Sequence, residues 1–72
     1  MAKKDGGVYR VTEVIGTSTN SWEDAARSAV ATAAGTLRDL RIAEIEKLDV
    51  KIENGKITQF RARMALSFKY EG

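Results

Sequence analysis

The stretch Ile57–Tyr70, ITQFRARMALSFKY, alternates almost perfectly between apolar and polar side chains. The apolar face carries Phe60, Ala62, Met64, Leu66, Phe68 and Tyr70. A period of two over this many residues predicts a β-strand with one buried face. At about 3.3 Å per residue the strand would be more than about 40 Å long, whereas most strands have about 5–6 residues. We therefore expect a long ribbon that one small helix cannot cover.

A second strand is predicted immediately before this one. Asn54-Gly55 between two strand-like runs is typical of a type I′ hairpin turn, since both of its central residues need positive φ. The run 41–52 alternates cleanly in its second half, but Ile45 is out of phase with that half. A β-bulge or strong bend near Glu46-Lys47 would bring the two halves into register.

The start of the chain indicates a third strand. Residues 8–15 are rich in β-branched side chains, and Gly16 is expected to end the strand. Residues 1–7 are polar and contain a Gly pair, so we interpret them as a flexible lead-in. Residues 8–72 then form one domain, because a chain of 72 residues has room for no more.

A helix is predicted between the first and second strands. Ser21 with Asp24 three residues later resembles a capping box, and Asn20 with Glu23 is the competing register. Small residues, mostly Ala, recur at helical spacing after the cap, which suits close packing on a sheet. The pattern places the end of the helix near residues 39–40.

These elements predict an α+β fold of order β-α-β-β, with a three-stranded antiparallel sheet wrapped around one helix. A chain this short buries only about 60% of its unfolded surface. Small domains usually add disulfides, a structural metal or further copies, and this chain has neither Cys nor His. We therefore expect a homo-oligomer.

Composition excludes several functional classes. The chain has 12 basic and 10 acidic residues, which are interspersed, so no basic stripe for nucleic acid is indicated. The sequence contains no run of about 18 apolar residues, so no membrane span is predicted. The polar first residues do not resemble a secretory signal. We expect a cytoplasmic protein. The lack of Cys and His leaves no convincing nucleophile and base, so no catalytic residues are assigned and an enzyme is not predicted.

A few side chains are candidates for binding. Glu44 and Glu46 lie two apart on a strand and share a face, which suits either a divalent cation or a solvated surface. Trp22 in the first helical turn suggests a core or interface contact, with ligand stacking as the alternative. Arg61 and Arg63 share the polar face of the last strand, and in an assembly they would need acidic partners or an anionic ligand.

Over residues 8–71 the chain resembles the dodecin family. The resemblance is carried by the opening VYRVTEVIGTS (8–18), the helix start SWE (21–23), TLRDL (36–40), IAEI (42–45) and LSFKYE (66–71). It implies the β-α-β-β fold and a hollow homododecamer of cubic symmetry. It also implies a small-ligand binding or storage protein, in many members one that binds flavins in pairs at subunit contacts.

The same resemblance points to ligand-binding positions. The flavin-stacking Trp of the family falls on Ile42 and the flavin-edge Gln on Arg61, and Arg41 and Ala43 flank the first of these. Ile has no π face, and Arg cannot accept a hydrogen bond. FMN, riboflavin or FAD is the ligand class that the family implies. The replaced pair is similar to a calcium-binding subgroup, so an ion-binding shell is the alternative, with metal ligands unassigned.

Overall fold

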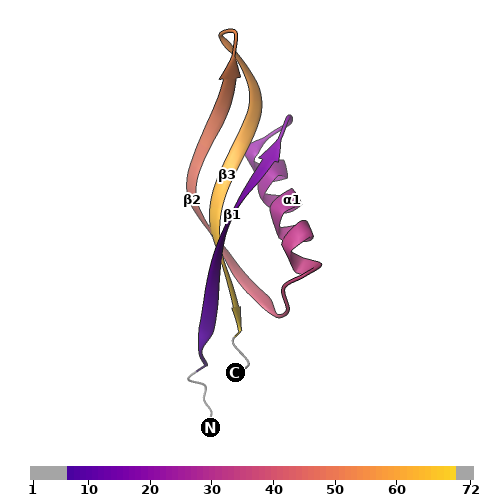
Figure 1. Cartoon of the computed structure of the whole chain (residues 1–72), viewed down its shortest axis with the longest axis vertical. Helices are drawn as coiled ribbons and strands as arrows, with labels where there is room; N and C mark the ends of the chain where they lie inside the picture. Colours follow the sequence, from indigo (N-terminus) through magenta and orange to yellow (C-terminus); the bar gives the residue numbers. More distant parts are fainter. Residues whose placement is uncertain (1–6, 70–72) are drawn as a thin grey trace.

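The structure, a computed structural model, describes residues 7–69 of the chain. Its elements are β1 (Tyr9–Ser18), α1 (Trp22–Ala34), β2 (Leu40–Glu53) and β3 (Lys56–Lys69). The strands form one antiparallel sheet of order β1-β3-β2 (Figure 1), so the predicted β-α-β-β fold is confirmed. The predicted lead-in, apart from Gly7, and the predicted last strand residue Tyr70 lie outside the described residues.

The hairpin between β2 and β3 dominates the shape. Each strand has 14 residues, and the turn between them has positive φ at Asn54 (52°) and Gly55 (74°). These angles are those of the predicted type I′ turn, which matches the twist of the strands that it joins. In Figure 1 the hairpin extends well beyond α1, and the protomer measures 57 × 21 × 17 Å.

The predicted bulge in β2 is present. The pairing of β2 with β3 shifts at Glu46, which is the extra residue. As a result Ile45 lies opposite Met64 and Leu48 lies opposite Ala62, on the face of the sheet that carries α1. A one-residue shift therefore brings both halves of β2 into phase with β3.

Gly16 does not end β1, which continues to Ser18. The side chains of Ala25 and Ala62 are fully buried where α1 packs on the sheet. A Cβ atom placed on Gly16 would overlap the carbonyl oxygen of Ala25 and lie 2.8 Å from the Cβ of Ala29. The glycine is therefore needed for the close approach of helix and strand, not as a strand breaker.

The helix begins where the capping pattern predicts. Ser21 is the N-cap, and its Oγ accepts a hydrogen bond from the backbone N–H of Asp24 at 3.0 Å. Ser18 Oγ donates to the Asp24 carboxylate at 2.7 Å and accepts from the backbone N–H of Asn20 at 2.9 Å. Of the two registers that the sequence left open, the structure therefore uses Ser21.

The helix ends earlier than residues 39–40. Its last residue is Ala34, and Gly35 is the C-cap. Glycine weakens a helix interior by about 1 kcal/mol relative to alanine, so the helix stops there rather than crossing it. The chain then turns through Asp39, whose φ is 56°, into β2. Within the described chain no helix has the length and apolar character needed to cross a membrane.

Much of the large apolar surface has no cover within one protomer. A helix of 13 residues spans about 20 Å, whereas a strand of 14 residues spans about 46 Å. The large apolar side chains that remain exposed are Val8, Tyr9, Val11, Ile15, Trp22, Ile42, Ile45, Leu48, Ile52 and Ile57.

The close approach at Gly16 gives a direct test. Gly16→Ala should lower the free energy of unfolding by about 1–3 kcal/mol, because the added methyl meets backbone and Cβ atoms that cannot move aside easily. Gly35→Ala is the matched control: its Cβ would lie 3.3 Å from the Thr32 carbonyl oxygen in a right-handed helical conformation, so a small effect is expected. Urea unfolding measures both. Equal stability of Gly16→Ala and the wild type would contradict this packing.

Candidate functional site

The candidate site lies on the face of the sheet opposite α1, which we call the open face. On β3 this face carries Gln59, Arg61, Arg63, Ala65, Ser67 and Lys69. Residues directly opposite one another in an antiparallel sheet share a face, so the register assigns the neighbours on β1 and β2. Ile42, Glu44, Lys47 and Asp49 of β2 belong to this face, as do Glu13 and Ile15 of β1.

Arg41, Ile42 and Ala43 come together at the start of β2. With Val30, Leu40 and Leu66 they line a small pocket of about 130 Å³. The side chain of Ile42 is 63% exposed and its residue lies opposite Ser67. This pocket is smaller than the roughly 300–1,000 Å³ that sites for organic ligands usually occupy. One protomer therefore supplies only part of a site for such a ligand here.

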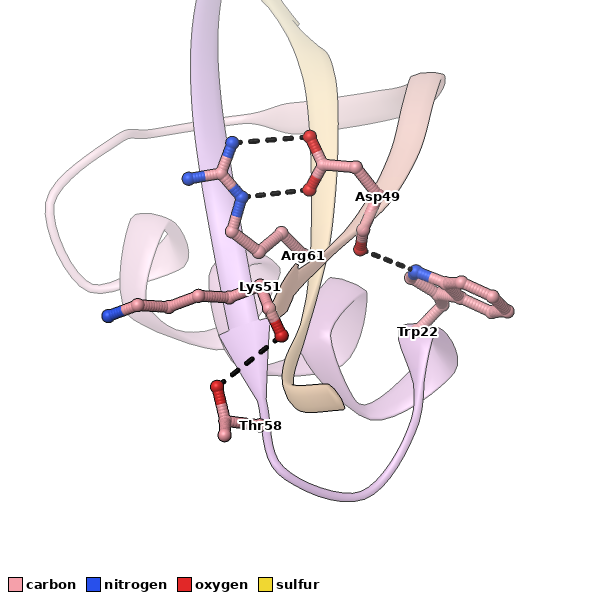
Figure 2. Close-up of polar contacts among 5 residues, drawn as sticks. All are labelled: Trp22, Asp49, Lys51, Thr58 and Arg61. Carbon is pink, nitrogen blue, oxygen red and sulfur yellow. Dashed lines mark hydrogen bonds and ion pairs between the residues drawn. The ribbon is translucent and has the colours of Figure 1, made fainter. Parts of the chain in front are cut away.

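Arg61 has an acidic partner within its own chain. Its Nε donates to Asp49 Oδ1 at 2.8 Å and its Nη2 donates to Asp49 Oδ2 at 3.2 Å (Figure 2). The hydrogen bonds from Arg61, and then the positive charges of Arg61, Arg63 and Lys47, lower the pKa of the Asp49 carboxyl. The same pair raises the pKa of Arg61. The guanidinium is thus already occupied on two of its donors.

Sequence reasoning missed Asp49 as this partner. The turn alone would place residue 48 opposite Arg61, but the pairing shifts by one residue between Lys51 and Ile52. Thr58 is the extra residue on β3, and its Oγ1 donates to the Lys51 carbonyl oxygen at 3.4 Å. Ile57 and Phe60 lie three positions apart, so they are out of phase in a regular strand, and sequence reasoning did not use this signal. The partner of Arg61 was therefore identified only in the structure.

Trp22 joins the helix to the same region. Its Nε1–H donates to the Asp49 carbonyl oxygen at 3.0 Å (Figure 2). Its ring packs edge-on against Phe60 at 5.2 Å between centroids. The indole thereby ties the first turn of α1 to β2 and β3. This supports the structural interpretation of Trp22 over a role in stacking on a ligand.

Carboxylates crowd together on the same face, two rows along β3 from the Asp49–Arg61 pair. We call Glu13, Glu44 and Glu46 the acidic row, because Glu13 and Glu44 both lie opposite Ala65 and Glu46 interacts with both. Loss of solvation, then the charge of Glu13 and a hydrogen bond with it, then the charge of Glu44, raise the pKa of Glu46. Arg63 acts in the opposite direction. Among residues 7–69, however, no group of three or more acidic side chains is arranged to hold a metal ion.

The structure does not bring Ile42 and Arg61 together in one protomer. Ile42 lies at the level of Ser67 on β3, six residues from Arg61, which corresponds to about 20 Å along the strand. Both residues belong to the open face, and the rows that carry Lys47, Arg63 and Glu44 lie between them. A small ligand that contacts both positions would need side chains from more than one copy.

A separate groove of about 460 Å³ runs between β1 and α1. Its lining is small or apolar, with hydroxyls such as those of Thr12, Ser28 and Thr32, and contains no charged side chain. None of the residues that the sequence singled out for ligand binding lines it. Ile15, which belongs to the open face, lines it as well, so the groove adjoins the candidate site at β1.

Comparison with known proteins gives consistent results. The family model described as Dodecin matches residues 8–71. The calcium dodecin of Mycobacterium tuberculosis (strain ATCC 25618 / H37Rv) is 43% identical over 63 residues, which cover 86% of this chain and 87% of that protein.

Solved structures agree with this match. The dodecin of Streptomyces coelicolor superposes with a TM-score of 0.89 at 36% identity, covering 96% of this chain and 99% of that one. The calcium dodecin of Mycobacterium tuberculosis, described as calcium chelating with a novel calcium-binding site, gives a TM-score of 0.79 at 40% identity, covering 89% and 91%.

The acidic row predicts a pH effect on stability. Because the folded chain holds the Glu46 proton more tightly than an unfolded chain does, the stability that this proton contributes is complete below the ordinary pKa of 4.5. It is lost as pH rises through the raised pKa. Glu46→Gln, which mimics the protonated form, should therefore gain stability relative to the wild type at pH 7 and not at pH 4.

Thermal unfolding at the two pH values measures this difference. Glu13→Gln removes the main charged neighbour and should reduce the same pH dependence by lowering the pKa of Glu46. A stability difference between Glu46→Gln and the wild type that is the same at pH 4 and pH 7 would contradict the crowding of these carboxylates.

Proposed function

This chain belongs to the dodecin family, and from that premise we propose that it is a small-ligand or ion-binding protein that works as a homododecameric shell and not as an enzyme. The exposed apolar side chains support assembly. Ile45 and Leu48 face the α1 side of the sheet and are 46% and 51% exposed, because the helix packs chiefly over β1 and β3. Further copies of the chain are the natural cover for this surface.

We propose that the ligand is a cation of the calcium type. The observation that carries this proposal is the 43% identity to a calcium dodecin over most of both chains. The acidic row adds a physical reason, because calcium prefers six to eight oxygen ligands and carboxylates supply them. Since the described part of one chain forms no metal site alone, the ligands would come from several copies that meet in the shell.

Riboflavin, FMN and FAD form the second candidate class, which family membership favours. In this reading Ile42, with Arg41 and Ala43 beside it, and Arg61 are the ligand-facing positions. Two observations weigh against flavin. The side chain of Ile42 offers apolar area without a π face, and Arg61 is hydrogen-bonded to Asp49.

Paired titrations distinguish the two ligand classes. We expect calorimetry to detect calcium binding by the assembled wild type, and Glu44→Gln with Glu46→Gln to weaken it about ten-fold or more, because two anionic ligands are lost. Riboflavin fluorescence should not be quenched by the same sample. Glu53→Gln is the matched control, since Glu53 pairs with Lys51 near the hairpin turn, away from the acidic row.

The native mass is measured on each sample so that loss of assembly is not mistaken for loss of binding. Quenching of riboflavin fluorescence without calcium binding would make flavin, and not calcium, the favoured ligand class. An intact shell that binds neither ligand would contradict the proposed function.

A further inference from the structure

The open face contains a group of cations arranged around one carboxylate. Lys47 and Arg63 lie directly opposite each other, and Asp49 and Arg61 form the next row of the same face. We call Lys47, Arg61 and Arg63 the basic cluster. The positive charges of all three act on the Asp49 carboxyl and lower its pKa. Asp49 is therefore surrounded by positive charge contributed by both strands of the hairpin.

The contact between Asp49 and Arg61 has the geometry that guanidinium groups use for anions. Two parallel donors, Nε and Nη2, meet the two carboxylate oxygens at 2.8 and 3.2 Å (Figure 2). Arginine binds phosphate oxygens through the same planar fork. The carboxylate of Asp49 thus occupies the place that a phosphate group of a ligand would take.

The backbone of Asp49 is held in place independently of Arg61. Its carbonyl oxygen accepts the hydrogen bond from the Trp22 indole, which is itself packed against Phe60. Strand pairing with β3 fixes the residue from the other side. The carboxylate is consequently presented to the basic cluster from an anchored position, at a low entropic cost for ordering it.

The other two cations are left without such a partner. Like charges directly opposite each other in a sheet destabilise it. Within residues 7–69, neither Lys47 nor Arg63 forms an ion pair with an acidic side chain at 4.0 Å or less. In the described part of the chain, Asp49 is the one residue whose carboxylate is hydrogen-bonded to this group of three cations.

We propose that Asp49 is a specificity-determining residue: it fills an anion-binding site built from Lys47, Arg61 and Arg63 and so keeps phosphate-bearing ligands off the open face. The carboxylate of Asp49 competes with the phosphate groups of ligands for the donors of the basic cluster. Uncharged or cationic ligands do not compete for these donors and are not excluded. The inference rests on the proposed function only through Arg61, which is one of the proposed ligand-facing positions.

Removing the carboxylate charge should open the site to anions. Asp49→Asn keeps the size of the side chain, and we expect it to bind inorganic pyrophosphate at least about ten-fold more tightly than the wild type, a change equivalent to about one charge-assisted hydrogen bond. Calorimetry at low ionic strength measures this affinity. FMN should show the same gain and riboflavin should not, because only FMN carries a phosphate.

Glu53→Gln provides the matched control. It removes one negative charge from the same strand, and its partner is Lys51 instead of the basic cluster. It should leave pyrophosphate affinity unchanged. Asp49→Asn combined with Arg63→Gln should lose most of the gain, because a cation of the site is missing. Asp49→Ser is measured in parallel, so that a folding defect in one variant does not decide the result.

Three results would overturn the inference: no gain in pyrophosphate affinity by folded Asp49→Asn and Asp49→Ser, an equal gain by Glu53→Gln, or an equal gain for riboflavin and FMN. Native mass and calcium binding are recorded on the same samples. An anion gain in an intact shell whose wild type binds neither calcium nor riboflavin would leave this inference standing and contradict the proposed function alone. Calcium binding without an anion gain would do the reverse.

Discussion

The structure depends on a mismatch of length between one helix and one hairpin. The two strands of the hairpin have 14 residues each, or about 46 Å, and α1 has 13 residues, or about 20 Å. The helix packs chiefly against β1 and β3, so most of the apolar side chains of β2, namely Ile42, Ile45, Leu48 and Ile52, stay exposed. Apolar area contributes about 25 cal/mol per Å² when it leaves water, and this surface can gain that contribution only from a further contact, which we propose is made by other copies. The exposed apolar surface of the hairpin therefore supports the proposed assembly before any ligand is considered.

Much of this fold could be predicted from the sequence because alternation fixes a strand and its buried face. The run 57–70 predicted β3, Asn54-Gly55 predicted the turn, and the phase break at Ile45 predicted the bulge at Glu46. Each signal is local, and each is a direct consequence of backbone geometry. The cap at Ser21 belongs to the same class, although a competing register had to be resolved by the structure.

The errors arose where distant parts of the chain meet. Gly16 was interpreted as a strand end, yet its role is to admit the backbone of α1, which a local pattern cannot show. The helix was expected to pass Gly35, which instead caps it. The partner of Arg61 depends on a register shift at Thr58, which the phase break between Ile57 and Phe60 marks but the prediction did not use. Site chemistry was therefore less predictable than fold, because ion pairs across strands depend on register.

On the open face, the basic cluster and the acidic row occupy neighbouring rows. The bidentate pair between Arg61 and Asp49 lies on the same face, and Arg61 is the position that matches the flavin-edge Gln of the family. All of this has functional meaning only if copies of the chain assemble. Sedimentation velocity of the purified chain over a wide range of dilution tests that claim most directly. The account predicts one compact species whose mass is a multiple of the 7.9 kDa chain, twelve-fold for the expected dodecamer. A folded species of 7.9 kDa that persists across the whole range would contradict it.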